Sequence, residues 1–132
     1  MGTAAVDRSL ILIVEDDDDS REGLAEFLRM SKFRVLTARE GKEGLALARH
    51  HCPKLILLDI NMPTMDGFAF CAAQRADRAI QTVPVIVISG RDDVAAMAEQ
   101  LGARGWLPKP FDPSQVLAAI VGVQSAPPPS GS

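Results

Sequence analysis

The chain has 132 residues, of which 47% are hydrophobic, and a formal net charge of −3. This length fits one domain that buries a core without disulfide or metal staples. The scattered lysines and arginines argue against direct binding to nucleic acid, and no apolar stretch is long enough to span a membrane. We therefore expect a cytoplasmic protein in which the two cysteines, Cys52 and Cys71, have no metal-binding or disulfide role.

Apolar runs alternate with amphipathic stretches along the chain. The expected strands are residues 10–14, 34–37, 54–58, 83–88 and 105–107. The expected helices are residues 21–30, 42–50, 68–76, 93–101 and 113–121. This alternation predicts an α/β fold with a single doubly wound, five-stranded parallel sheet and five flanking helices. The first, third and fourth strands are apolar throughout, as central strands are, whereas the second and fifth suit the sheet edges.

Polar residues suggest where several helices begin and end. Asp19 or Ser20 is expected to cap the first helix, and Asp112 the fifth. Gly102 and Gly122 are expected to end the fourth and fifth helices.

The folded domain is predicted over residues 7–123. Residues 1–6 are expected to form a flexible N-terminus. Residues 124–132 are rich in Pro, Ser and Gly and are expected to be a disordered tail or the stub of a linker. The chain is then either complete by itself or a domain taken from a longer protein.

Polar groups stand at the ends of four of the predicted strands. Glu15 and Asp16 follow the first strand, Asp59 the third, Ser89 the fourth, and Lys109 lies just beyond the fifth. In an open parallel sheet such strand ends meet in one crevice. Two unit charges about 4 Å apart repel each other by ~4 kcal/mol at an effective dielectric constant near 20. Three converging carboxylates therefore indicate a cation site.

The chemistry of these groups suggests phosphoryl transfer. A site of oxygen ligands alone, with few of them from the protein, favours Mg²⁺ over Ca²⁺. Asp59 can attack phosphorus as a nucleophile while the metal and Lys109 neutralise phosphoryl oxygens and Ser89 donates a hydrogen bond. Gly90 has no side chain to obstruct that approach.

Four short motifs together resemble the response-regulator receiver domain of two-component signalling, of the chemotaxis-regulator type. They are Glu15-Asp16, Asp59 in the run D-I-N-M-P-T-M-D-G, Ser89-Gly90 and Lys109-Pro110-Phe111. The resemblance covers essentially the whole folded chain. It implies a flavodoxin-like fold with strand order 2-1-3-4-5.

The resemblance also implies a phosphoacceptor and a metal site. Asp59 would accept a phosphoryl group from a phosphohistidine of a sensor histidine kinase or histidine phosphotransfer protein. Asp16 and Asp59 would bind Mg²⁺ directly, the main-chain carbonyl of Asn61 would complete the protein ligands, and Glu15 would act through water. Asn61, two residues after the acceptor, would also tune a slow autodephosphorylation.

The remaining implied roles concern switching. Ser89 and Lys109 would hold the phosphoryl group, Arg91 would tune its loss, and the bond before Pro110 is expected to be cis. Trp106 stands at the family's aromatic switch position, where Tyr or Phe is usual, and the alternative is a partly buried packing residue. The face of the fourth helix, fifth strand and fifth helix would bind an unknown downstream protein or a second copy of the chain.

Three functions remain open from the sequence. The first is a phosphorylation-driven switch, which would catalyse only its own phosphorylation and dephosphorylation. The second is a phosphatase of the haloacid dehalogenase type, which requires an Asp two residues after the nucleophile, where this chain has Asn61. The third is a receiver fold that serves as a constitutive interaction module.

Overall fold

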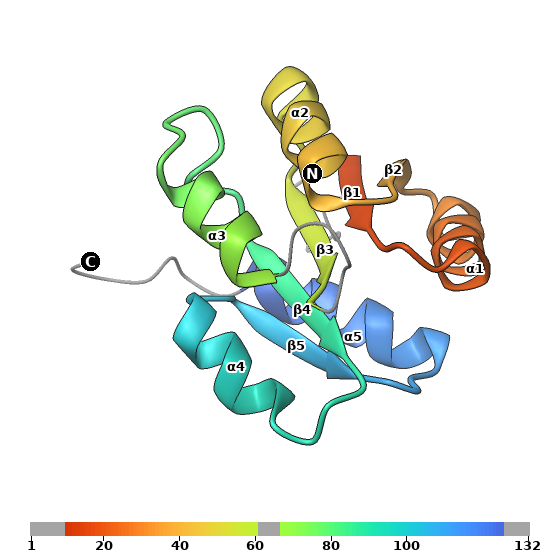
Figure 1. Cartoon of the computed structure of the whole chain (residues 1–132). Helices are drawn as coiled ribbons and strands as arrows, with labels where there is room; N and C mark the ends of the chain where they lie inside the picture. Colours follow the sequence, from red (N-terminus) through yellow and green to blue (C-terminus); the bar gives the residue numbers. More distant parts are fainter. Residues whose placement is uncertain (1–9, 61–66, 126–132) are drawn as a thin grey trace.

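The computed structural model describes residues 10–60 and 67–125, where strands and helices alternate (Figure 1). The strands are β1 (Leu10–Val14), β2 (Arg34–Ala38), β3 (Leu55–Asp59), β4 (Val85–Ser89) and β5 (Gly105–Pro108). The helices are α1 (Asp18–Met30), α2 (Gly41–His51), α3 (Gly67–Arg75), α4 (Val94–Leu101) and α5 (Pro113–Ser125). The strands pair in parallel in the order β2-β1-β3-β4-β5, which confirms the predicted fold and strand order.

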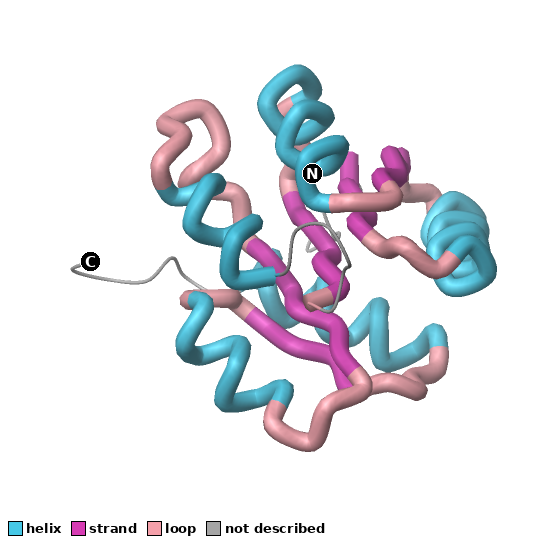
Figure 2. The backbone as a smooth tube through the Cα atoms, in the orientation of Figure 1, coloured by secondary structure: helices cyan, strands magenta, loops and turns pink. Residues whose placement is uncertain are grey.

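Helices cover both faces of the sheet (Figure 2). The side chains of each strand point alternately toward one layer of helices and the other. On one face, Leu12 and Val14 of β1 join a core with α2, α3 and α4. On the other, Ile11 and Ile13 pack with α1 and α5. Side chains of a strand point to opposite faces in turn, so a strand covered on both sides must be apolar throughout. This is why the central strands could be recognised in the sequence.

The first helix begins earlier than expected. Its N-cap is Asp17, whose carboxylate accepts a hydrogen bond from the Ser20 main-chain N–H at 2.8 Å, so the prediction of Asp19 or Ser20 as the cap is wrong. Four consecutive aspartates each offer a suitable acceptor, and the sequence does not distinguish them. The predicted cap of α5 is confirmed, because Asp112 accepts from the Gln115 main-chain N–H at 3.1 Å.

The C-terminal boundary also needs correction. Gly102 ends α4 in the left-handed conformation, with φ of 73°, as predicted. Gly122, however, lies inside α5, which continues to Ser125, so the first two residues of the predicted tail 124–132 are helical. Continuing the helix buries Val123 in the core. Burying a valine is worth about 1.5 kcal/mol or more, which exceeds the cost of about 1 kcal/mol for a helical glycine.

The predicted flexible segment 1–6 and residues 126–132 of the predicted tail lie outside the described residues. Within the described ranges, none of the helices combines the length and apolar character that a membrane crossing requires.

At the amino ends of the strands, a buried polar side chain holds the connection between α3 and β4. Gln74 of α3 is buried, and its side-chain amide donates to the main-chain carbonyls of Ile80 at 2.9 Å and Val83 at 2.8 Å. These two bonds hold the connection between α3 and β4 against the helix. Nearby, the Arg75 guanidinium donates to the Leu101 carbonyl at the end of α4.

The close packing of α2 on β1 predicts opposite effects for two glycine-to-alanine substitutions. At Gly44 a Cβ would lie 2.8 Å from Val14 Cγ2 and 3.3 Å from the Phe70 ring, and both neighbours are fully buried. Gly44→Ala should therefore lower the free energy of unfolding by roughly 1–3 kcal/mol. The matched control is Gly23→Ala in α1, where nothing lies within 4 Å, and it should raise that free energy by about 0.5–1 kcal/mol. Urea unfolding measures both, and equal signs would contradict the packing argument.

Candidate functional site

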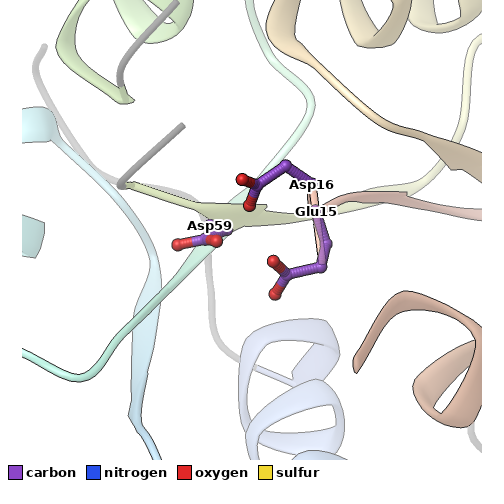
Figure 3. A group of neighbouring side chains, drawn as sticks. All are labelled: Glu15, Asp16 and Asp59. Atoms are coloured by element: carbon purple, nitrogen blue, oxygen red, sulfur yellow. The ribbon is translucent and has the colours of Figure 1, made fainter. Parts of the chain in front are cut away.

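Three carboxylates gather at the carboxyl ends of β1 and β3 (Figure 3). Glu15 and Asp16 directly follow β1, and Asp59 is the last residue of β3. The two strands are parallel neighbours in which Val14 pairs with Leu58, so the acids emerge side by side. Carboxylate oxygens of all three residues lie within 4.8 Å of one another. The structure thus brings together the acids that the sequence predicted to meet.

Among the described residues, one lysine reaches into this cluster. Lys109 Nζ lies 3.0 Å from Glu15 Oε1 and 3.6 Å from Asp59 Oδ2. The Lys109 main-chain N–H donates to the Ser89 carbonyl at 2.8 Å, which continues the pairing of β4 with β5 past the strand end. Glu15 and Asp59 are each 4% exposed, whereas Asp16 faces solvent. The ion pairs are therefore largely shielded from water on the acid side.

The charges of the site do not balance. Burial raises the pKa of Glu15, a hydrogen bond with Asp59 raises it further, and the hydrogen bond from Lys109 partly opposes this. Burial alone would lower the pKa of Lys109, but its hydrogen bond with Glu15 and the charge of Asp59 outweigh burial and raise that pKa. Lys109 thus stays a cation, yet one positive charge faces three carboxylates. Oxygen donors with an excess of negative charge fit a hard divalent cation such as Mg²⁺.

Ser89 completes the inner wall of the site. It is the last residue of β4, beside β3, and is 0% exposed. Its Oγ accepts a hydrogen bond from the Arg91 main-chain N–H at 3.0 Å. A hydroxyl that accepts from the main chain keeps its own proton for donation. A Cβ at Gly90 would lie 3.8 Å from Lys109 Cβ, an ordinary contact, so space alone does not require glycine there.

The other predicted residues lie around this centre. The Arg91 guanidinium pairs with Asp93, with Nε 3.1 Å from Oδ1. The bond between Lys109 and Pro110 is cis, as the resemblance implied. Trp106 of β5 is 45% exposed and lines a hollow of about 590 Å³ together with small residues of α4 and α5. Asn61 lies outside the described residues.

The sequence reading missed Arg21. This residue of α1 is buried, and its guanidinium donates to the main-chain carbonyl of Glu15 at 3.1 Å. A signal was available, because Arg21 shares the helical spacing of the buried Ala25 and Leu28 and so lies on the inward face. An arginine at such a position needs acceptors inside the protein.

Comparisons with known proteins identify the family of this chain. Residues 11–121 match the response regulator receiver domain. The transcriptional regulatory protein PrrA of Mycobacterium tuberculosis is 42% identical over 113 residues, which cover 83% of this chain and 47% of PrrA. The response regulator Rre1 of Synechocystis is 34% identical over 113 residues, covering 83% of this chain and 49% of Rre1.

Two solved structures share the fold of this chain. The chemotaxis response regulator CheY4 of Vibrio cholerae superposes with a TM-score of 0.81 at 31% identity, over 87% of this chain and 98% of CheY4. The non-phosphorylated HemR receiver domain of Leptospira biflexa gives a TM-score of 0.79 at 28% identity, over 92% and 98% of the two chains.

Sequence and structural relatives agree on one class of protein, a signalling domain of two-component systems. The chain belongs to the response regulator receiver domain family. It spans about half the length of the curated relatives it matches. The predicted lack of nucleic-acid binding stays a prediction, because relatives named as transcriptional regulators extend well beyond the matched part. The predicted cytoplasmic location stays a prediction, and so does the predicted N-terminal limit of the domain at residue 7.

The charge imbalance predicts that neutralising one acid stabilises the metal-free protein. Asp59→Asn keeps the side-chain shape and removes one of three mutually repelling charges. The raised pKa of Glu15 has the same sign, because a carboxyl whose folded pKa exceeds its unfolded value destabilises the fold when ionised. In a chelator at pH 7, the melting temperature should rise by about 4 °C, or roughly 1 kcal/mol.

The control for this substitution is Glu26→Gln, at an exposed position of α1, which should leave the melting temperature unchanged. A lower melting temperature for Asp59→Asn would mean that Lys109 attracts Asp59 more strongly than the other two acids repel it.

Proposed function

We propose that this chain is a phosphorylation-activated signalling switch in which Asp59 accepts the phosphoryl group. The observation that carries the proposal is a buried carboxylate within a cluster of three acids, with the ammonium group of Lys109 3.6 Å away. Membership of the receiver family supports it and gives no support to a phosphatase of the haloacid dehalogenase type.

The acidic cluster would hold Mg²⁺. Asp16 and Asp59 would be direct ligands, Glu15 would act through water, and the main-chain carbonyl of Asn61 would complete the protein ligands. When bound, the ion supplies positive charge to the phosphoryl oxygens during transfer. The exposed carboxylate of Asp16 leaves the cluster accessible from solvent, as a site that keeps several waters on its metal requires.

The residues of the chain account for the transfer itself. A carboxylate oxygen of Asp59 forms a bond to phosphorus as the phosphorus–nitrogen bond of a phosphohistidine breaks, and the leaving imidazole takes up a proton from solvent. Lys109 would move its ion pair from the Asp59 carboxylate to a phosphoryl oxygen. The Ser89 hydroxyl would donate its remaining proton to another oxygen.

The phosphodonor would be a sensor histidine kinase or a histidine phosphotransfer protein. A cavity of about 520 Å³ opens beside Glu15 and Lys109, and Leu24, Phe27 and Phe111 contribute its apolar walls. A cavity of this character suits an apolar segment of the donor that brings its imidazole to the site.

Phosphorylation would shift an equilibrium between two arrangements by the energy that Ser89 and Lys109 gain in only one of them. The face formed by α4, β5 and α5 would change its affinity for a downstream protein or a second copy. Trp106 lies exposed on that face. Arg91, now paired with Asp93, would tune the slow loss of the phosphoryl group.

The proposal predicts a covalent product with a small phosphodonor. The chain incubated with Mg²⁺ and acetyl phosphate should gain one phosphoryl group in an acid-stable, base-labile linkage, with acetate as the leaving group. Intact-mass spectrometry measures the adduct, and chelation of Mg²⁺ should prevent it. Asp59→Ala should abolish it.

The matched control for the adduct is Asp92→Ala, which removes an exposed carboxylate outside the acidic cluster and should keep the adduct. Absence of the adduct while calorimetry detects bound Mg²⁺ would contradict the proposal. Steady turnover of small phosphate esters would instead support a phosphatase.

Switching predicts an optical change, because Trp106 is the one tryptophan in the sequence. Beryllofluoride with Mg²⁺ should alter the emission of the wild-type protein, and Ser89→Ala should reduce that change severalfold while Mg²⁺ still binds. The reason is that Ser89 would transmit occupancy of the acidic site toward β5. Unchanged emission together with unchanged partner binding would favour a constitutive interaction module.

A further inference from the structure

Arg21 is a buried cation that the proposed transfer chemistry does not use. It lies in α1 and is 3% exposed. Among the described residues that are buried, it is the single positively charged one. Removing a guanidinium from water costs several kcal/mol unless its hydrogen bonds are replaced. The position of Arg21 therefore depends on the acceptors around it.

Two of those acceptors are main-chain carbonyls of the acidic cluster. Arg21 Nη1 donates to the carbonyl of Glu15 at 3.1 Å and lies 3.5 Å from the carbonyl of Asp16. Nη2 donates to Asp18 Oδ1 at 2.5 Å. The side chain of Asp18 is 71% exposed, so solvent weakens this ion pair. The part of the interaction that is shielded from solvent is thus the pair of contacts, here called the grip of Arg21, between its Nη1 and the two carbonyls.

This grip fixes the backbone from which two of the acids project. A carbonyl held at a defined point sets the rotation of its peptide group, and so the direction in which the neighbouring side chains leave the chain. The Glu15 carboxylate is held further by the Asp17 main-chain N–H at 3.1 Å and by Lys109 at 3.0 Å. Glu15 is therefore held both through its main-chain carbonyl and through its side-chain carboxylate.

We propose that Arg21 is a positioning residue that makes the acidic cluster selective for Mg²⁺ over Ca²⁺. Mg²⁺ requires near-ideal octahedral geometry with ligands at about 2.0–2.1 Å, whereas Ca²⁺ accepts longer and less regular coordination. A fixed β1–α1 connection favours the smaller ion. A loosened connection still offers carboxylates to the larger one. The inference rests on the proposed function only in requiring that the cluster bind a divalent cation.

Two substitutions separate geometry from charge. Arg21→Lys keeps the positive charge but loses the fork that holds two carbonyls at once. Arg21→Met fills a similar space with a flexible apolar chain and buries no charge, so it is the second variant if Arg21→Lys fails to fold. The loss of charge in Arg21→Met strengthens binding of both ions by the same Coulomb energy, and this effect alone leaves their affinity ratio unchanged. A fall in the ratio therefore reports the lost geometry.

The experiment is calorimetric titration of the full chain with Mg²⁺ and, separately, Ca²⁺, with circular dichroism to confirm folding. The ratio of Mg²⁺ to Ca²⁺ affinity should fall about tenfold in both variants, through weaker Mg²⁺ binding in Arg21→Lys. The matched control is Arg29→Lys, an exposed arginine of the same helix, which should keep the wild-type ratio.

Two outcomes would overturn this inference. Wild-type affinities for both ions in folded Arg21→Lys would show that Arg21 does not set the geometry, and equal weakening for both ions would show a merely structural role. Both leave the proposed function intact, because the wild-type protein binds Mg²⁺ in each. Absence of Mg²⁺ binding by the wild-type protein would overturn the proposed function and this inference together.

Discussion

The mutual repulsion of three carboxylates is the constraint on which the site depends. Glu15 and Asp59 are buried, Asp16 lies beside them, and Lys109 is the cation that contacts two of the three. Such an arrangement is destabilising by itself, and protein folds keep buried charges in excess chiefly where function requires them. The same imbalance that weakens the fold makes the cluster suited to a divalent cation.

The sheet supplies the geometry at little cost. The carboxyl ends of parallel strands lie along the same side of the sheet. Acids separated by more than 40 positions in the sequence therefore meet there, and no long loop has to be ordered. Lys109 directly follows β5, the outer strand of the sheet, which pairs with β4. The polar residues therefore lie at the ends of strands or directly after them, and main-chain hydrogen bonds hold Glu15 and Lys109 next to the sheet.

Much of the fold and of the acidic cluster could be predicted from the sequence. The central strands are covered on both faces, so each is an unbroken apolar run, and the run in β3 ends in Asp59. Local signals were less reliable where several acceptors compete, as at Asp17, or where tertiary packing overrides local preference, as at Gly122. The hydrogen bonds of Arg21 depend on how the β1–α1 connection folds, so composition and motif spacing did not reveal them.

The carboxyl and amino ends of the strands are held by different interactions. The carboxyl ends hold ion-paired charged groups, whereas at the amino ends the neutral amide of Gln74 donates to two main-chain carbonyls. Breaking these hydrogen bonds would leave buried acceptors without donors, which costs about 1–3 kcal/mol for each group. The amino ends of the strands therefore form a fixed frame, so a change of charge at the carboxyl ends leaves the connection between α3 and β4 in place.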